Sequence, residues 1–159
     1  SGDFVDPSGF ITDSVPNRQP VLSQSELVSR FGHPNDISLT TVDFFGRKVR
    51  VNEKIGDNFR SVAADIRASG IDYEFWRDLA GGTYNKRKMR GSDKWSTHAF
   101  GVAMDINPAS NPYYSRKRGM ECRMDLPAEV VAAFKKNGFC WGGQFTTVCD
   151  AMHFEYCDY

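Results

Sequence analysis

The chain lacks the features that would draw a protein to nucleic acid or into a membrane. Lys plus Arg and Asp plus Glu each number 20, so the formal net charge is zero. No basic excess favours nucleic acid or an anionic membrane surface. No apolar run approaches the roughly 20 residues that a membrane span needs. We therefore expect specificity to come from a local site.

The chain has the length of about one domain, at 159 residues. Its hydrophobic fraction of 40% is enough for a single core. No signal-peptide pattern is present at the start. Ser1-Gly2 is the kind of remnant that a cleaved tag leaves, so this start says little about the native compartment.

Cysteine is scarce, and its spacing fits neither a zinc ribbon nor a thioredoxin motif, because no C-x-x-C pair is present. All four cysteines fall in the last quarter of the chain: Cys122, Cys140, Cys149 and Cys157. An even, clustered count favours two disulfides and an oxidising compartment. The alternative is four buried thiols. Four cysteines allow three pairings, and spacing does not choose among them.

Local patterns predict an α+β fold with a mostly antiparallel central sheet flanked by helices. Ser23-Gln24-Ser25-Glu26 is a capping box that begins a short helix. Apolar residues at helical spacing from Phe59 to Ile66 mark an amphipathic helix that ends at Gly70. The other predicted elements are an extended arm at 1–20, β-structure at 41–52, strands at 71–76 and 101–107, polar loops at 77–95 and 108–126, a helix opened by Pro127, and two closing strands near 138–143 and 151–156.

Histidine occurs only three times, and no H-E-x-x-H motif is present, which excludes the familiar helical zinc protease. His33 follows a helix stop and is interpreted as a surface or capping residue. His153 alternates with large apolar residues in "DAMHFEY". A period of two places His153 and Glu155 on the face opposite those apolar side chains, where they can face a cleft.

Asp105 stands in the small-apolar run "GVAMDIN", seven residues after His98. This odd separation would put the two side chains on opposite faces of one continuous strand, and Gly101 is where a bend between them is cheapest. Two imidazoles and a carboxylate that converge form a ligand set for catalytic zinc. Spacing alone leaves another interpretation open, in which a His-Asp pair stabilises the fold and His153 is unrelated.

Two motifs carry a resemblance to a known family. Residues 96–105 fit S-x-H-x-x-G-x-A-x-D, and residues 150–155 read D-A-M-H-F-E. Over roughly residues 40–157 the chain resembles the zinc D-alanyl-D-alanine carboxypeptidases and L-alanyl-D-glutamate endopeptidases of peptidoglycan, to which vancomycin-resistance dipeptidases and several phage endolysins are similar. The hedgehog signalling domain is similar in fold. The resemblance implies a catalytic domain at 41–159, with an N-terminal arm and short helix packed on it at 1–40.

The resemblance also implies individual roles. One Zn²⁺ per chain would be held by His98, Asp105 and His153. Asp150, three residues before His153, would be the general base and acid.

Further roles follow from the same resemblance or stay open. Arg87 is implied to contact the substrate carbonyl, with Arg90 as the alternative. The Ser96 hydroxyl either binds substrate or stabilises a turn. Trp141 either lines the cleft or packs. Glu155 either accepts a hydrogen bond from the free nitrogen of His153 or only lines the rim of the site.

The implied function is a zinc metallopeptidase that hydrolyses peptidoglycan stem peptides, expected to be a monomer. The implied location is extracytoplasmic, or the protein is a phage endolysin. Asp150 stands where the vancomycin-resistance D,D-peptidases carry Glu, so the chain is more similar to the L-alanyl-D-glutamate endopeptidases. D-alanyl-D-alanine carboxypeptidase is the alternative. A zinc-containing module without catalysis and a disulfide-bonded structural protein without metal are the remaining hypotheses.

Overall fold

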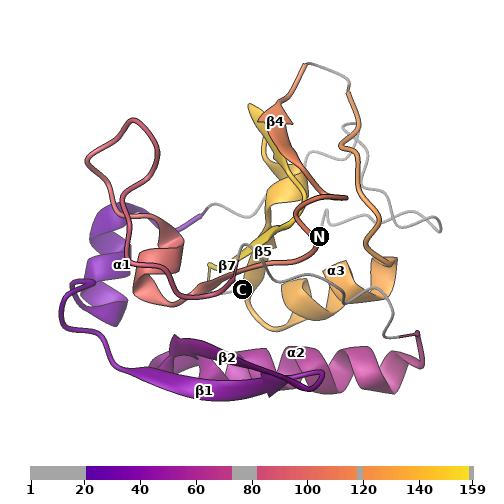
Figure 1. Ribbon diagram of the computed structural model, residues 1–159, viewed down its shortest axis with the longest axis horizontal. Coiled ribbons are helices and arrows are strands. Elements are labelled where there is room, and N and C mark those ends of the chain that lie inside the picture. The colour runs from indigo at the N-terminus through magenta and orange to yellow at the C-terminus, as the bar shows by residue number, and fades with distance from the viewer. Residues whose placement is uncertain (1–20, 73–81, 118–119, 158–159) are drawn as a thin grey trace.

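The computed structural model describes residues 21–72, 82–117 and 120–157 (Figure 1). These residues form three α-helices and seven short strands, and every strand pair is antiparallel. The predicted α+β class is confirmed. The strands are divided among three small sheets, the largest of which has three strands.

Helix α1, Gln24–Phe31, begins at the predicted capping box. The Glu26 backbone N–H donates to Ser23 Oγ at 3.1 Å, and the Ser23 backbone N–H donates to Glu26 Oε1 at 2.9 Å. The helix is also fastened to a distant segment. The Gln24 side chain accepts from Trp95 N at 2.7 Å and donates to Trp95 O at 3.3 Å, so α1 holds the backbone that leads to His98.

A hairpin follows, made of β1, Leu39–Phe44, and β2, Arg47–Asn52. Both turn residues have positive φ, 52° at Phe45 and 85° at Gly46. This is the backbone that a tight two-residue hairpin turn requires. Glycine at the second turn position therefore lets the predicted β-segment at 41–52 fold back on itself.

Helix α2, Gly56–Ser69, follows the short 3₁₀ helix η1, Glu53–Ile55, and packs along the hairpin (Figure 1). The apolar face predicted from Phe59 to Ile66 is buried. Gly70 ends the helix in the left-handed conformation, with φ 76°. Both the face and the end of this helix are confirmed.

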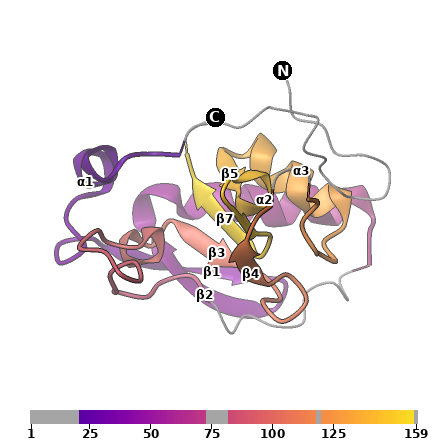
Figure 2. The ribbon, with the colours of Figure 1, turned by 90° about the horizontal axis from the view of Figure 1, so that it is seen from above.

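The three-stranded sheet holds β7 in the middle, between β3 and β5 (Figure 2). The strands are β3, Ala103–Asp105, β5, Phe139–Trp141, and β7, His153–Tyr156. Helix α3, Ala128–Lys136, precedes β5 and packs on the same core. The register pairs Asp105 directly with His153. Directly paired residues on neighbouring strands point to the same face, which brings two predicted ligands together.

The last sheet was not predicted. It pairs β4, Tyr113–Ser115, with β6, Val148–Asp150. The loop predicted at 108–126 therefore contains a strand. Three residues are too few to show a period, and the pairing partner lies more than thirty positions away in the chain. Buried Asn111 anchors this segment, since its side chain accepts from Asp125 N at 2.9 Å and donates to Asp125 Oδ1 at 2.8 Å.

Trp141 packs in the core and is only 2% exposed. Its indole N–H donates to Ala151 O at 2.7 Å, and its ring stacks on Phe154. The packing interpretation of this residue is the one that the structure supports. A short 3₁₀ helix, η4, Gly142–Gln144, follows it.

Several predictions fall where the structure gives no description. The arm at 1–20 lies outside the described residues, as do residues 73–81, which cover most of the strand predicted at 71–76. Of the loop predicted at 77–95, the described part forms only an isolated bridge between Lys88 and Trp95. Within the described ranges, none of the helices has the length and apolar character that crossing a membrane requires.

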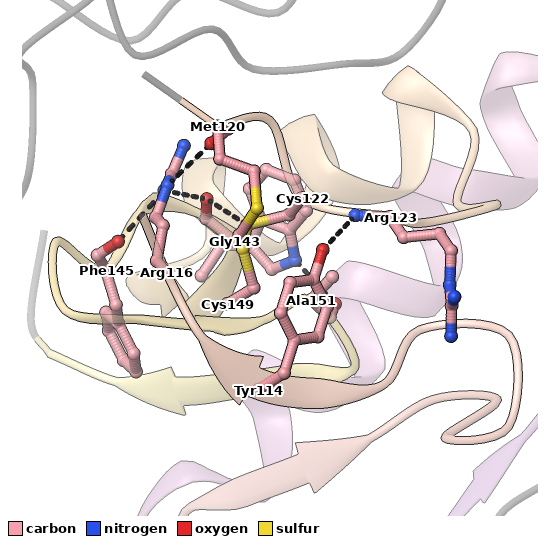
Figure 3. The surroundings of a disulfide bond; sticks show 10 residues. Tyr114, Arg116, Met120, Cys122, Arg123, Gly143, Phe145, Cys149 and Ala151 are labelled. Carbon is pink, nitrogen blue, oxygen red and sulfur yellow. Dashed lines mark hydrogen bonds between the residues drawn. A yellow bond between two sulfur atoms is a disulfide. The ribbon is translucent and has the colours of Figure 1, made fainter. Parts of the chain in front are cut away.

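All four cysteines are paired, Cys122 with Cys149 and Cys140 with Cys157. The first bond ties the segment before α3 to β6 (Figure 3). The second joins β5 to the residue that follows β7. The structure confirms two disulfides and selects one of the three pairings that the sequence left open.

We predict that the purified, non-reduced chain has a mass about 4 Da below the all-thiol value, because each bridge removes two hydrogens. Proteolytic mapping without reduction should recover the peptide pairs of Cys122 with Cys149 and of Cys140 with Cys157. Removing either bridge should lower the free energy of unfolding by about 2–5 kcal/mol. Four titratable thiols in the untreated protein would contradict the pairing.

Candidate metal centre

Three side chains predicted as metal ligands lie together. One ligand atom from each of His98, Asp105 and His153 lies within 4.8 Å of the others. Asp105 joins the two imidazoles, with Oδ2 at 3.2 Å from His98 Nε2 and Oδ1 at 3.0 Å from His153 Nδ1. Within the described part of the chain this is a group that could hold a metal ion. We call these three side chains the metal group.

His98 reaches the group from a 3₁₀ helix, η3, Thr97–Phe100, and not from a strand. Gly101 ends this helix in the left-handed conformation, with φ 73° and ψ 24°. The chain therefore bends where the sequence predicted. Asn52 fixes the bend, since its backbone N–H donates to Gly101 O at 2.8 Å and its side chain donates to Phe100 O at 3.0 Å. A Cβ on Gly101 would lie 2.8 Å from Asn52 N, so only glycine fits here.

Two acceptors outside the group orient the imidazoles. His98 Nδ1 lies 2.8 Å from Thr83 O, and a carbonyl can only accept, so Nδ1 is the donor and Nε2 faces Asp105. His153 Nε2 lies 2.8 Å from Glu155 Oε1, so Nε2 donates and Nδ1 faces Asp105. Glu155 thus makes the contact expected of it. Such outer acceptors are a regular feature of metal-bound histidines.

This donor set suits zinc. Two imidazole nitrogens and one carboxylate oxygen, within 4.8 Å of one another, correspond to the three protein ligands of a catalytic zinc site. The outer hydrogen bonds to Thr83 O and Glu155 leave one nitrogen of each ring for the ion. The residues therefore fit the metal that the motifs imply.

The metal group is buried. His98 is 2% exposed, Asp105 8% and His153 7%. The Phe145 ring is one cause, since its centroid lies 6.3 Å from that of His153. Alternation along a strand defines two faces but not what covers each of them.

The burial of the group shifts two pKa values in opposite directions. Burial alone would raise the pKa of Asp105, but hydrogen bonds from His153 and His98 outweigh it and hold that pKa far below its ordinary value. Burial would likewise lower the pKa of His153. Its hydrogen bonds to Asp105 and Glu155 prevail and raise that pKa well above the ordinary value. Without metal, these contacts therefore favour the protonated form of His153.

Asp150 lies beside the metal group at the end of β6 and is partly exposed. Burial is the main cause that raises its pKa, and the Asp105 and Glu155 carboxylates add to the increase. None of the described residues forms a hydrogen bond or ion pair with its carboxylate. Gly142 allows the close approach of this strand, because a Cβ there would collide with the Asp150 carbonyl oxygen.

The structure leaves the remaining candidates outside the metal group. The Arg87 and Arg90 side chains are exposed, and neither pairs with an acid in the described part of the chain. Ser96 is buried and caps η3, its Oγ accepting from His98 N at 3.2 Å. That is the turn-stabilising role left open above. The roles of Arg87 and Ser96 toward substrate stay predictions.

Sequence reasoning missed Thr83 and Gln24. Thr83 contributes through its carbonyl, and every residue has one, so no residue type could have indicated it. Gln24 contributes through hydrogen bonds to Trp95 across 71 positions of sequence, and its local context indicated only helix formation. Both contacts depend on long-range packing.

We predict that one zinc ion binds per chain and that its apparent affinity falls as the pH is lowered. Zinc competes for His153 with a proton, whose binding the raised pKa favours, so calorimetry in buffers of different ionisation enthalpy should detect proton release. His153→Ala should lose the bound zinc, whereas His33→Ala, which changes a histidine outside the group, should retain it. Full zinc content in His153→Ala would refute the ligand assignment.

A comparison with known families agrees with this site. Residues 90–156 match the family described as D-alanyl-D-alanine carboxypeptidase. The matched segment contains the metal group and Asp150, and it begins after Arg87. The match confirms the resemblance drawn from the two motifs. Over residues 90–156 the chain is therefore similar to the D-alanyl-D-alanine carboxypeptidase family of peptidases.

Proposed function

We propose that the protein is a zinc-dependent peptidase that hydrolyses the stem peptides of peptidoglycan. The observation that carries this proposal is the convergence of His98, Asp105 and His153 beside an acid with a raised pKa. A site of this composition can bind an ion and move a proton. The similarity of residues 90–156 to a carboxypeptidase family supports a peptide bond of the cell wall as the target.

When bound, zinc would supply a Lewis acid for the scissile carbonyl and a water of lowered pKa. The chain's own residues prepare for this. Thr83 O and Glu155 keep the two rings in the orientation that aims one nitrogen of each at the ion. Asp105 adds a negative charge, which leaves the loaded site less positive than three histidines would.

Asp150 is the proposed general base and acid. It would accept a proton from the attacking water and deliver that proton to the leaving amine. A raised pKa suits both steps, since the group must first accept a proton and then release it. No covalent nucleophile is needed, and all four cysteines are in disulfides. Arg87, or else Arg90, would stabilise the oxyanion.

An extracytoplasmic site of action fits these features. Two disulfides are stable in an oxidising compartment, and peptidoglycan lies outside the cytoplasm. A phage endolysin that reaches the same polymer is the alternative source.

We expect Asp150→Asn to retain zinc and to lose turnover by a factor of ~10²–10⁴, the usual contribution of general acid-base catalysis. Turnover of cell-wall fragments and bound zinc should be measured on the same preparation. Asp57→Asn is the matched control, because Asp57 is an exposed acid on α2, and it should behave as the unmodified protein. Near-normal turnover in Asp150→Asn would remove Asp150 from the mechanism.

We further propose that the bond cleaved is the one between L-Ala and D-Glu. The support is Asp150 in place of Glu, as in the endopeptidases that the chain resembles. An endopeptidase must accommodate substrate on both sides of the scissile bond.

The cleaved bond can be read from product masses after digestion of a purified pentapeptide muropeptide. We predict release of an intact peptide that begins at D-Glu, with the terminal D-Ala-D-Ala retained. Release of a single D-Ala without an internal cut would establish the carboxypeptidase alternative. No cleavage by zinc-loaded protein would favour the module without catalysis.

A further inference from the structure

Tyr113 is the most exposed large hydrophobic residue of the described chain, at 62%. It opens β4, directly after the segment anchored by Asn111. Nothing in the fold requires a tyrosine ring at such a position. An exposed aromatic ring beside a functional site is a candidate contact for a ligand.

The strand register places this ring next to the proposed base. Tyr113 is paired directly with Asp150. Residues paired in this way have Cβ atoms roughly 4.5–5.5 Å apart and point to the same face of the sheet. The next pair, Tyr114 and Cys149, points to the other face, where Cys149 is fully buried and Tyr114 packs against the core. Tyr113 and Asp150 therefore share the outer face.

The backbone beneath the ring is held firmly. Cys149, adjacent to Asp150, is bonded to Cys122, and Tyr114 Oη accepts from Arg123 N at 2.7 Å (Figure 3). Arg116 follows β4, and its Nη1 donates to Gly143 O at 3.1 Å and to Phe145 O at 2.9 Å. These bonds connect β4 to the loop that covers His153. Tyr113 is thus a fixed feature of the site, which limits the entropy lost on binding a ligand.

The role of Asp150 indicates which part of a substrate meets the ring. The general acid delivers its proton to the leaving amine, so the residue after the scissile bond must lie beside Asp150. A substrate chain that leaves the metal group past Asp150 then passes over Tyr113. In either of the two bonds considered, the residue after the scissile bond, D-Glu or the terminal D-Ala, carries a carboxylate.

We propose that Tyr113 binds the residue that follows the scissile bond. Its ring packs on the backbone and side-chain carbons of that residue, and its hydroxyl donates a hydrogen bond to the carboxylate. This inference rests on the proposed function, because it takes Asp150 as the acid. It does not depend on which of the two bonds is cut.

The test uses zinc-loaded Tyr113→Ala and Tyr113→Phe, with Val28→Ala as the control that removes an exposed apolar side chain from α1. A contact made equally in the ground state and the transition state raises KM and leaves kcat nearly unchanged. We expect KM to rise about tenfold in Tyr113→Ala and by a smaller factor in Tyr113→Phe, which keeps the ring. Val28→Ala should match the unmodified protein.

Inhibition by the two reaction products then identifies the side of the scissile bond. The product that carries the new amine should inhibit Tyr113→Ala about tenfold less than the unmodified protein, while the product that carries the new carboxylate should inhibit both equally. Unchanged inhibition by the amine product, or an equal loss for both products, would overturn the assignment. If the unmodified protein does not turn over substrate, the proposed function fails, and direct binding of the two peptides to the variants still tests Tyr113.

Discussion

The candidate site depends on Asp105, one buried carboxylate shared by two imidazoles. Burying a charged group is costly unless it is paired and hydrogen-bonded. Here the pairing is supplied by His98 and His153, and Thr83 O and Glu155 satisfy the outer nitrogen of each ring. Removing any one of these residues would leave a buried charged or polar group without its hydrogen-bond partner. The same features make it a suitable place for a divalent cation.

The rest of the fold holds these groups in register. Asp105 and His153 are opposite each other on paired strands, so their separation is set by the sheet. His98 needs a helical turn and a glycine bend, and the end of β2 binds that bend through Asn52. Helix α1 adds a further constraint, since Gln24 fixes the backbone of Trp95. The N-terminal helix therefore supports the site although it lies before the segment that matches the family.

Exposure rises from the metal group outward, and the proposed chemistry follows the same order. The ligands are buried, Asp150 is partly exposed, and Tyr113 on the paired strand is open to solvent. A buried ligand set can hold an ion, a partly buried acid can exchange protons with substrate and water, and an exposed ring can meet a long peptide. The Cys122–Cys149 bond and Arg116 connect the outer two positions to the loop that covers His153.

The sequence by itself determined what local spacing encodes. The capping box at Ser23 fixed the start of α1, helical spacing fixed the buried face of α2, and alternation placed His153 and Glu155 on one face of a strand. The odd separation of His98 and Asp105 also indicated that Gly101 would bend the chain. Only the tertiary structure decided which distant segments meet: the pairing of β4 with β6, the choice among three disulfide connectivities, the acceptor role of Thr83, and the enclosure of the metal group. The physical reason is that periodicity acts over a few residues, whereas these contacts join segments that only the packed core brings together.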